Sequence, residues 1–596
     1  MSVLDRIERL RNVMEQQKID CYIIPTDDYH HSEYVGDYFK FREYITGFTG
    51  SAGTAVFTKD KAGLWTDGRY FIQAEAQLKG SGIMLYKSGE SDVPTIEEFL
   101  KSELKEGDVL GFDGRTVTYA QGKRYCHIAD ENGASLKYSL DFAQNIWKER
   151  PEMSMEPVFS LEDEYTGEKI GSKLERIREI MKENGCNAHV LSSLDDIAWL
   201  LNIRGNDIAY CPLVLSYAIV YNNSVELFAD IRKFSDDIIN LLAENQVKIY
   251  PYEDIYRKVS EMTSEDKLLL DSAIMNYSLY QAISKETVIV DKQNPEILMK
   301  SVKNETQAEN LRKAHLKDAV AHTKFMYWLK KNIGRVEITE LSASARLEGL
   351  RAEQEHFLGP SFGPISAYGE HGAIVHYSAD EKSNVPLKEG KLFMTDTGGH
   401  YLEGSTDITR TVALGEVGNI EKEHFTLVAR AMLRLANTVF LYGCSGANLD
   451  CIAREVFWKE GLNFNHGTGH GVGYLLNIHE GPINFRWKEG ERPAPALEEN
   501  MVITDEPGIY IEGSHGIRLE NELLVRKTVK NEYGQFMNFE ILTYVPIDLD
   551  AILPEKMNTE EKEMLNHYHK QVYEKVSPYL SEEERIWLKE YTRAVK

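Results

Sequence analysis

Three short blocks in the second half of the chain decide the fold. They read MTDTGGHYLEGSTDITRTV (residues 394–412), FNHGTGHGVGYLLNIHEGP (464–482) and VITDEPGIYIEGSHGIRLENELLV (502–525). The first block holds two acids, Asp396 and Asp407, and the third holds Glu506 and Glu520. Glycines lie between the two acids of each pair. Because glycine marks chain reversals, each of these two blocks is expected to form a β-hairpin.

The positions of the acids predict the register of the first hairpin. In an antiparallel pair, opposed residues have a constant sum of residue numbers. If Asp396 faces Asp407, the turn centres between Tyr401 and Leu402. Strand side chains alternate, so Thr409 is expected on the same face as Asp407.

The third block gives the same pattern and raises a problem of charge. If Glu506 faces Glu520, the turn centres on Gly513. Four carboxylates cannot lie together uncompensated, because like charges raise each other's pKa. Two divalent cations about 3.5–4 Å apart remove this conflict and form a hydrolytic device. Taken singly, each of these acids is more often a turn residue, so only the three blocks together indicate a metal centre.

The second block supplies histidines. His466 and His470 have helical spacing, but Gly467 and Gly469 argue against a helix there. A site with many carboxylate oxygens and one imidazole suits a hard ion such as Mn²⁺ better than it suits a thiolate-type zinc site.

Composition excludes several classes of protein. The chain has 596 residues and a net charge of −26, from 68 basic and 94 acidic residues. This charge argues against a nucleic-acid or anionic-membrane partner. The six cysteines form no C-x-x-C motif, and the sequence has neither a signal-peptide core nor an apolar run long enough to span a bilayer. We therefore expect a cytoplasmic protein.

The rest of the chain predicts an α/β protein of three domains. A helical stripe followed by a buried strand occurs near residues 4–25 and again at 174–191, which suggests a duplication. The expected domains are residues 1–158 (α/β), 159–300 (α/β) and 301–596 (α+β), the last ending in a helical extension from about 551 to 596. The stretch from Glu305 to Trp328 lacks glycine and proline and predicts a long helix.

The three blocks resemble the metallopeptidase family with the pita-bread fold, which includes methionine aminopeptidase, prolidase and aminopeptidase P. Residues 47–55 and 65–70, and residues 196–205 of the second domain, are similar to segments of the long, three-domain aminopeptidase P, the Xaa-Pro aminopeptidase. The resemblance implies two creatinase-like amino-terminal domains followed by a pita-bread catalytic domain.

The resemblance also implies roles for individual residues. The metal ligands would be Asp396 on one ion, Asp407 and Glu520 bridging both ions, and His470 and Glu506 on the other ion. His376 and His479 would bind the substrate, His479 would meet the carbonyl oxygen, and Glu506 would also carry protons, so that these three are the catalytic candidates. Arg69 would contact the substrate, and His466 and Arg518 would support the ligands.

The function implied is removal of the first residue from peptides with proline at the second position, by attack of a hydroxide that bridges two divalent ions. The ions would be Mn²⁺, with Zn²⁺ or Co²⁺ as alternatives, and the assembly would be a homodimer. Prolidase, which acts on Xaa-Pro dipeptides, is the nearest rival. A non-catalytic pita-bread binding protein and the metal-free creatinase are further alternatives, and the filled ligand positions argue against both.

Overall fold

The computed structural model describes residues 1–488, 490 and 493–596. These residues form two compact units. Unit 1 comprises Met1–Leu161 and Glu168–Glu296, and unit 2 comprises Glu162–Gly167 and Ile297–Lys596. The predicted boundaries after residues 158 and 300 stay predictions.

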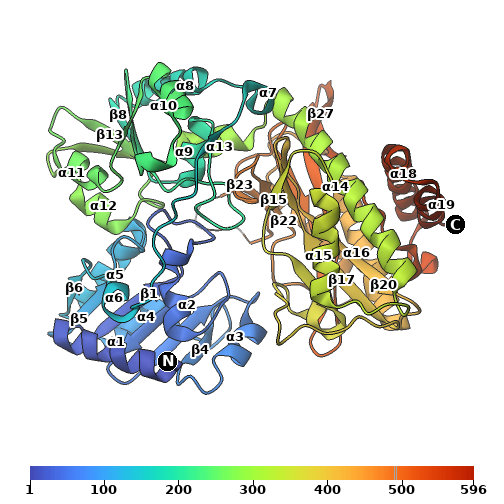
Figure 1. Ribbon diagram of the computed structural model, residues 1–596, viewed down its shortest axis with the longest axis horizontal. Helices are drawn as coiled ribbons and strands as arrows, with labels where there is room; N and C mark the ends of the chain where they lie inside the picture. The colour runs from blue at the N-terminus through green and yellow to red at the C-terminus, as the bar shows by residue number, and fades with distance from the viewer. Residues whose placement is uncertain (489, 491–492) are drawn as a thin grey trace. The chain divides into compact units, whose positions relative to one another are not determined.

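Unit 1 contains two six-stranded mixed sheets (Figure 1). In spatial order, the first consists of β4 (Met84–Lys87), β3 (Ala62–Thr66), β2 (Thr54–Thr58), β1 (Cys21–Pro25), β5 (Val109–Phe112) and β6 (Ser135–Lys137). The second consists of β12 (Val247–Tyr250), β11 (Val225–Phe228), β10 (Tyr217–Tyr221), β8 (Ala188–Leu191), β13 (Lys267–Leu270) and β14 (Val288–Asp291).

Both sheets have the same topology. In each sheet the first strand along the chain pairs antiparallel with the second and parallel with the fifth. In each, the third and fourth strands are parallel, as are the fifth and sixth. The repeated helix–strand order in the sequence therefore corresponds to a repeated topology, as a duplication predicts.

Helices cover both faces of the first sheet, and strand alternation explains this. On β1, Tyr22 and Ile24 belong to one apolar cluster, and Cys21 and Ile23 belong to another. The first cluster includes residues of α1 (Val3–Gln17) and α6 (Phe142–Ile146), and the second includes residues of α4 (Ile96–Glu103) and α5 (Tyr119–Glu131). The remaining helices of unit 1 are α2 (Phe41–Thr46), α3 (Phe71–Gln77), α8 (Ile170–Glu183), α9 (Leu194–Leu200), α10 (Asp236–Glu244), α11 (Asp254–Ser260) and α12 (Tyr277–Ala282).

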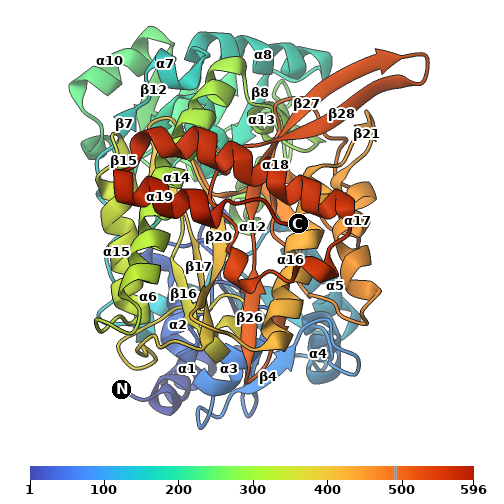
Figure 2. The same ribbon diagram turned by 90° about the vertical axis from the view of Figure 1, so that its right-hand side faces the viewer.

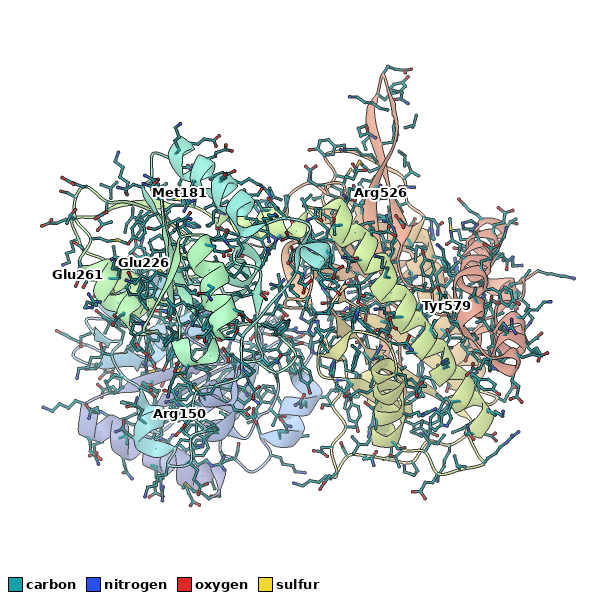
Figure 3. The ribbon with its side chains drawn as sticks, turned by 45° about the horizontal axis from the view of Figure 1, so that its top comes forward. Arg150, Met181, Glu226, Glu261, Arg526 and Tyr579 are labelled. Atoms are coloured by element: carbon teal, nitrogen blue, oxygen red, sulfur yellow. The ribbon has the colours of Figure 1, made fainter. Side chains whose placement is uncertain are left out.

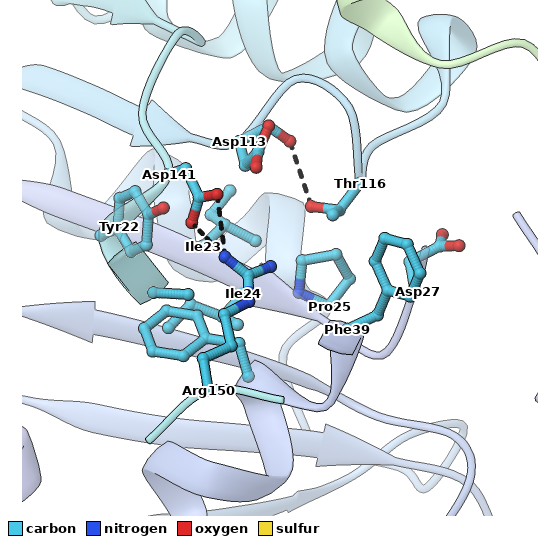
Figure 4. A pocket seen from close by; sticks show the side chains of 12 residues that line it. Tyr22, Ile23, Ile24, Pro25, Asp27, Phe39, Asp113, Thr116, Asp141 and Arg150 are labelled. Carbon is cyan, nitrogen blue, oxygen red and sulfur yellow. Dashed lines mark hydrogen bonds and ion pairs between the residues drawn. The ribbon is translucent and has the colours of Figure 1, made fainter. Parts of the chain in front are cut away.

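A small cavity of about 30 Å³ lies beside β1 in unit 1 (Figure 4). It is large enough for about one water molecule. Asp113 and Asp141 are among the residues that line it, and Arg150 donates to both oxygens of Asp141 at 3.2 and 3.0 Å. Arg115 bonds both acids as well, so ion pairs surround this cavity.

Unit 2 contains several small sheets and one six-stranded sheet. The small sheets are β15 (Phe357–Pro360), β18 (Gly399–Tyr401) and β19 (Gly404–Ser405); β16 (Ile365–Tyr368), β17 (Lys391–Thr397) and β20 (Ile408–Leu414); and the hairpin β25 (Gly508–Ile511) and β26 (His515–Arg518). The large sheet has the order β21 (Phe440–Leu441), β28 (Gly534–Ile541), β27 (Asn521–Asn531), β24 (Val502–Asp505), β22 (Gly469–Val472) and β23 (His479–Phe485).

The helices of unit 2 share one apolar core with these strands. The α-helices that contribute buried residues to this core are α14 (Glu305–Asn332), α15 (Glu340–Ala352), α16 (Asn419–Ala436), α17 (Gly446–Trp458), α18 (Thr559–Val576) and α19 (Glu582–Tyr591). The long helix predicted from Glu305 is confirmed as α14. The expected helical extension corresponds to α18 and α19, which lie side by side in Figure 2.

The hairpin β27–β28 projects from the large sheet (Figures 2 and 3). β27 is buried through Val525 and exposed from Lys527 onward, and Arg526, labelled in Figure 3, marks the change. Across the part of the chain that the structure describes, a search for helices long and apolar enough to cross a membrane finds none.

Candidate metal centre

The five predicted ligands lie at or beside strands of unit 2. Asp396 is on β17, and Asp407 directly precedes β20. His470 is on β22, Glu506 directly follows β24, and Glu520 lies between β26 and β27. Strands far apart in the sequence therefore bring one histidine and four acids to one place.

The register of the first hairpin differs from the one predicted. Asp396 pairs with Thr409 rather than with Asp407, and the same register continues through β18 and β19 to a turn at residues 402–403. The expected pairing was wrong by two residues. A shift of two keeps every side chain on its face, so both carboxylates still lie on the same face as diagonal neighbours.

Gly398 lies beside the facing segment of this hairpin rather than in its turn. A Cβ atom at this position would lie 1.8 Å from the carbonyl oxygen of Thr406 on the facing segment. Glycine is therefore required there for a close backbone approach and does not mark the turn.

The second hairpin has the register that the acids predicted. Gly508 pairs with Arg518, and Ile511 pairs with His515. The turn centres on Gly513, whose φ of 70° favours glycine. The pairing of β25 with β26 ends just before Glu506 and Glu520, so both acids lie at the open end of the hairpin.

Ligand atoms of these residues converge in three overlapping groups. The groups are Asp396, Asp407 and Glu520; His470, Glu506 and Glu520; and Asp407, His470 and His479. Within each group the atoms lie within 4.8 Å of one another. Nε2 of His470 is 3.5 Å from Oδ2 of Asp407 and 3.6 Å from Oε1 of Glu506.

The electrostatics of these residues fit cation binding. Burial raises the pKa of Asp396, Glu506 and Glu520, and repulsion by Asp407 adds to the effect on each. Burial also acts to raise the pKa of Asp407, but the hydrogen bond and charge of His470 outweigh it and lower the value. Among the described residues, Oδ1 of Asp396 is buried and accepts no hydrogen bond. Four acids with one imidazole therefore suit two divalent cations, which would relieve the repulsion.

Arg518 is the permanent cation beside these acids. One guanidinium nitrogen donates to Oδ2 of Asp396, and another donates to Oη of Tyr510 at 2.7 Å. Tyr510 in turn contacts Nε2 of His466 at 2.8 Å, and Nδ1 of His466 lies 2.7 Å from the carbonyl oxygen of Gly467. Burial lowers the pKa of His466 to about 3, so this imidazole is neutral and its Nε2 accepts a hydrogen bond from the hydroxyl of Tyr510.

Sequence reasoning missed Tyr510. The hairpin register contained the signal, because Arg518 faces Gly508 and Tyr510 is therefore its diagonal neighbour on the same face. Tyr510 bonds both Arg518 and His466, so His466 can support the ligands through Tyr510 and Arg518, as predicted.

Two further supports were also missed. Oε1 of Glu522 accepts the backbone N–H of Asp407 at 2.7 Å, and its other oxygen lies 3.1 Å from Nε2 of His315 on α14. Thr409 donates its hydroxyl to Glu520 at 2.8 Å. His315 lies 81 residues before Asp396, the nearest ligand in sequence, so only the packing of α14 on the sheet reveals this contact.

The substrate-binding candidates of unit 2 lie close to the acids. The ring of His479, at the start of β23, is 4.4 Å from the ring of His470 and nearly perpendicular to it. His376 follows the short helix η3 (Gly369–Ala373), and Arg518 donates to the carbonyl oxygen of the preceding Val375 at 3.3 Å.

Arg69 lies in unit 1, in the turn between β3 and α3. It forms a paired contact with both carboxylate oxygens of Asp67, each at 2.8 Å. Its side chain is about one third exposed. The structure of unit 1 therefore leaves part of this guanidinium open to solvent, and the predicted role of Arg69 stays a prediction.

Relatives of known activity match almost the whole chain. A *Dictyostelium discoideum* protein named Xaa-Pro aminopeptidase 1 is 36% identical over 97% of this chain and 94% of its own length. Aminopeptidase P1 of *Arabidopsis thaliana* is 34% identical over 99% of both chains. The model of metallopeptidase family M24 matches residues 309–527, and that of the C-terminal region of this peptidase matches residues 535–595.

The chain belongs to the Xaa-Pro aminopeptidases of metallopeptidase family M24. The predicted enzyme class and the predicted family are thereby confirmed. Models of the creatinase/prolidase N-terminal domain match residues 6–137 and 149–307, which confirms the predicted fold class.

Solved structures of M24 peptidases agree. The X-prolyl aminopeptidase of *Caenorhabditis elegans*, described as a cytosolic enzyme with a di-nuclear active site, superposes with a TM-score of 0.95 at 34% identity, and the match covers 100% of both chains. An Xaa-Pro dipeptidase from *Bacillus anthracis* shares the fold over only 64% of this chain, with a TM-score of 0.51 at 24% identity. The full-length match supports an aminopeptidase rather than a prolidase.

Proposed function

We propose that this M24 peptidase removes the N-terminal residue from peptides with proline second, and that it does so with two divalent cations. The observation that carries the proposal is the convergence of four acids and His470 at one largely buried place. Asp396 would hold one cation and His470 with Glu506 the other, while Asp407 and Glu520 would bridge the two.

When bound, the two cations would acidify a water molecule and polarise the scissile carbonyl group. Glu506, which lies within the ligand group, takes the proton that the attacking water gives up and passes it to the leaving nitrogen. His479 donates to the carbonyl oxygen as negative charge develops on it. His376 binds the peptide, and Arg518 keeps Asp396 in place through its charged hydrogen bond.

The donor set supports a proposal for the identity of the cations. Carboxylate oxygens with one imidazole favour Mn²⁺, with Zn²⁺ and Co²⁺ as the alternatives. Among the described residues, no cysteine belongs to the ligand groups. Metal analysis of the protein purified without added metal distinguishes the three ions.

The location and assembly are also proposed. We propose a cytoplasmic homodimer. The C. elegans relative is described as cytosolic, and among the described residues no disulfide joins any of the six cysteines, which fits a reducing compartment. Exposed apolar side chains such as Val529 and Tyr533 on the β27–β28 hairpin are available for a contact between subunits. Light scattering at several protein concentrations tests the dimer.

The decisive experiment compares hydrolysis of an Xaa-Pro-Yaa tripeptide and an Xaa-Pro dipeptide, each with Mn²⁺ and with a chelator. We expect cleavage of the tripeptide that is lost on chelation and returns with Mn²⁺. Cleavage of the dipeptide alone would contradict the proposed substrate class. Activity that survives complete removal of metal would contradict the proposed cation chemistry.

A further inference from the structure

One buried carboxylate outside the metal centre collects an unusual number of hydrogen bonds. Glu340, the first residue of α15, has a side chain that is 0% exposed. Its Oε1 atom lies 2.8 Å from the backbone nitrogen of Tyr368 and 2.8 Å from Nδ1 of His371. Its Oε2 atom accepts from Oη of Tyr377 at 2.9 Å and from the backbone nitrogen of Val385 at 3.3 Å.

All four donors belong to one loop, residues 368–385. The backbone of Glu340 adds to them, because its N–H donates to the carbonyl oxygen of Val385 at 3.2 Å and its own carbonyl oxygen accepts from Ser366 at 2.7 Å. A carboxylate that receives several hydrogen bonds holds its donors more strongly than a neutral acceptor does. Glu340 therefore ties both ends and the middle of this loop to the start of α15.

The loop carries His376, and its two neighbours are held from opposite sides. Arg518 donates to the carbonyl oxygen of Val375, on the side of the metal centre. Glu340 accepts from Tyr377, on the side of α15. The ring of Tyr377 also lies 4.5 Å from that of His371, and it belongs to a small apolar cluster with Met394, two residues before Asp396.

The backbone of the same loop lies directly against β26. A Cβ atom on Gly516 would be 1.6 Å from the carbonyl oxygen of Gly372, so the two glycines allow a contact that other residues would prevent. The loop is thus held by β26, by Arg518 on the same strand, and by Glu340 on α15.

We propose that Glu340 is a positioning residue for substrate binding, which acts by fixing the loop that presents His376. The proposal rests on the proposed role of His376 in binding the peptide. Glu340 touches neither the ligands nor the substrate in this account. Glu340 instead determines the position of the His376 imidazole when a peptide binds.

The main test is Glu340→Gln, which keeps the size of the side chain and removes its charge. The amide group offers N–H donors where two loop donors need an acceptor. The KM for an Xaa-Pro-Yaa tripeptide should rise about tenfold while kcat changes less, as expected for the loss of a charged hydrogen bond that acts on binding. The bound metal content and the unfolding temperature are measured on the same samples.

Two further variants provide a second test and a control. Tyr377→Phe removes one donor without changing any charge, and it should raise KM about two- to threefold, less than Glu340→Gln does, because Glu340 keeps its three other donors. It tests the proposal even if Glu340→Gln folds poorly. Glu348→Gln, on an exposed position of the same helix, is the matched control and should leave KM unchanged.

A double-mutant cycle decides whether Glu340 acts through His376. In the His376→Ala background, Glu340→Gln should no longer raise KM. If His376→Ala itself leaves KM unchanged, the proposed role of His376 is wrong. If His376→Ala raises KM but Glu340→Gln does not, the proposed function survives and the positioning role of Glu340 is overturned. An equal rise in KM with and without His376, or a loss of bound metal, would also overturn it.

Discussion

The molecule gathers acids in two places, and the two clusters differ in charge balance. Beside the cavity of unit 1 in Figure 4, which Asp27 also lines, two acids pair with two permanent cations, and this cluster comprises Asp113, Asp141, Arg115 and Arg150. In unit 2, four acids face one arginine and one histidine, namely Asp396, Asp407, Glu506, Glu520, Arg518 and His470. The first cluster is neutral by itself. The second has more negative charge than its own residues neutralise, and this surplus distinguishes a cation site from a structural ion-pair network.

The largest expected effect tests the surplus of charge directly. Glu520→Gln removes one bridging carboxylate, and kcat should fall by on the order of 10³-fold because charge stabilisation at the reacting centre is lost. In the metal-free protein the same change should raise Tm, since it removes a buried repulsion with Asp407. Peptidase assays and calorimetry of the chelated protein measure the two effects. If metal-free Glu520→Gln has a lower Tm than the metal-free wild type, the cluster does not carry the excess negative charge that we infer.

The balanced cluster should respond with the opposite sign. Asp141→Asn leaves Arg115 and Arg150 without their shared carboxylate, and it should lower the free energy of unfolding by about 2 kcal/mol, less than for a fully buried pair because Asp141 is partly exposed. Urea denaturation measures the loss. Glu8→Gln, at an exposed position of α1, is the control that should change little. Equal stability of the Asp141 and Glu8 variants would show that this cluster is not an ion-pair network.

The sequence predicted the metal centre better than it predicted the details of its hairpins. Glycines and paired acids identified both hairpins, and the register of the second was right because Gly513 is a true turn residue with positive φ. The first register was wrong because Asp396 faces Thr409, so the assumption that the two acids oppose each other failed. The error did not affect which residues meet, since a slip of two residues preserves the face of a strand.

The residues that hold the metal centre in place could not be predicted from the sequence, for a different reason. His315 on α14 contacts Glu522, and Glu340 on α15 holds the loop that carries His376. Both contacts depend on how these helices pack against segments distant in the chain. Local patterns report hairpins and helices, but they do not report which helix face meets which loop. Tyr510 is the exception, because the hairpin register alone places it beside Arg518.

Arg518 is the single arginine among the acids of the unit 2 cluster. Arg518→Lys keeps the charge but cannot bond Asp396 and Tyr510 together, since an ammonium group lacks the planar fork of a guanidinium. The affinity for Mn²⁺ should fall about tenfold, as for other changes to groups that orient metal ligands. Titration calorimetry of the metal-free variant measures this. Tyr510→Phe keeps the bond to Asp396 and should have a smaller effect, and the reverse order would contradict the role given to Arg518.

The smallest effect concerns a balanced pair in which the cation can lose its proton. In unit 1, His189 and Glu296 are both 0% exposed, with Nε2 of His189 3.2 Å from the carboxylate. Nδ1 of His189 lies 3.0 Å from the carbonyl oxygen of Leu269, so both ring nitrogens face acceptors, which favours the charged imidazole. Burial acts to lower the pKa of His189, but the charge and hydrogen bond of Glu296 outweigh burial and raise it.

The sign of the pH dependence follows from this raised pKa. The pair contributes its full stability below the ordinary histidine pKa of about 6.5, and the contribution is lost as pH rises through the higher pKa of the folded state. The loss should be on the order of 1 kcal/mol, measured by urea denaturation between neutral and mildly alkaline pH. His189→Gln can bond both acceptors without titrating, so its stability should not show this decline. If wild type and variant decline equally, the balance in unit 1 does not depend on His189, and the contrast with the metal centre then rests on the arginine pairs alone.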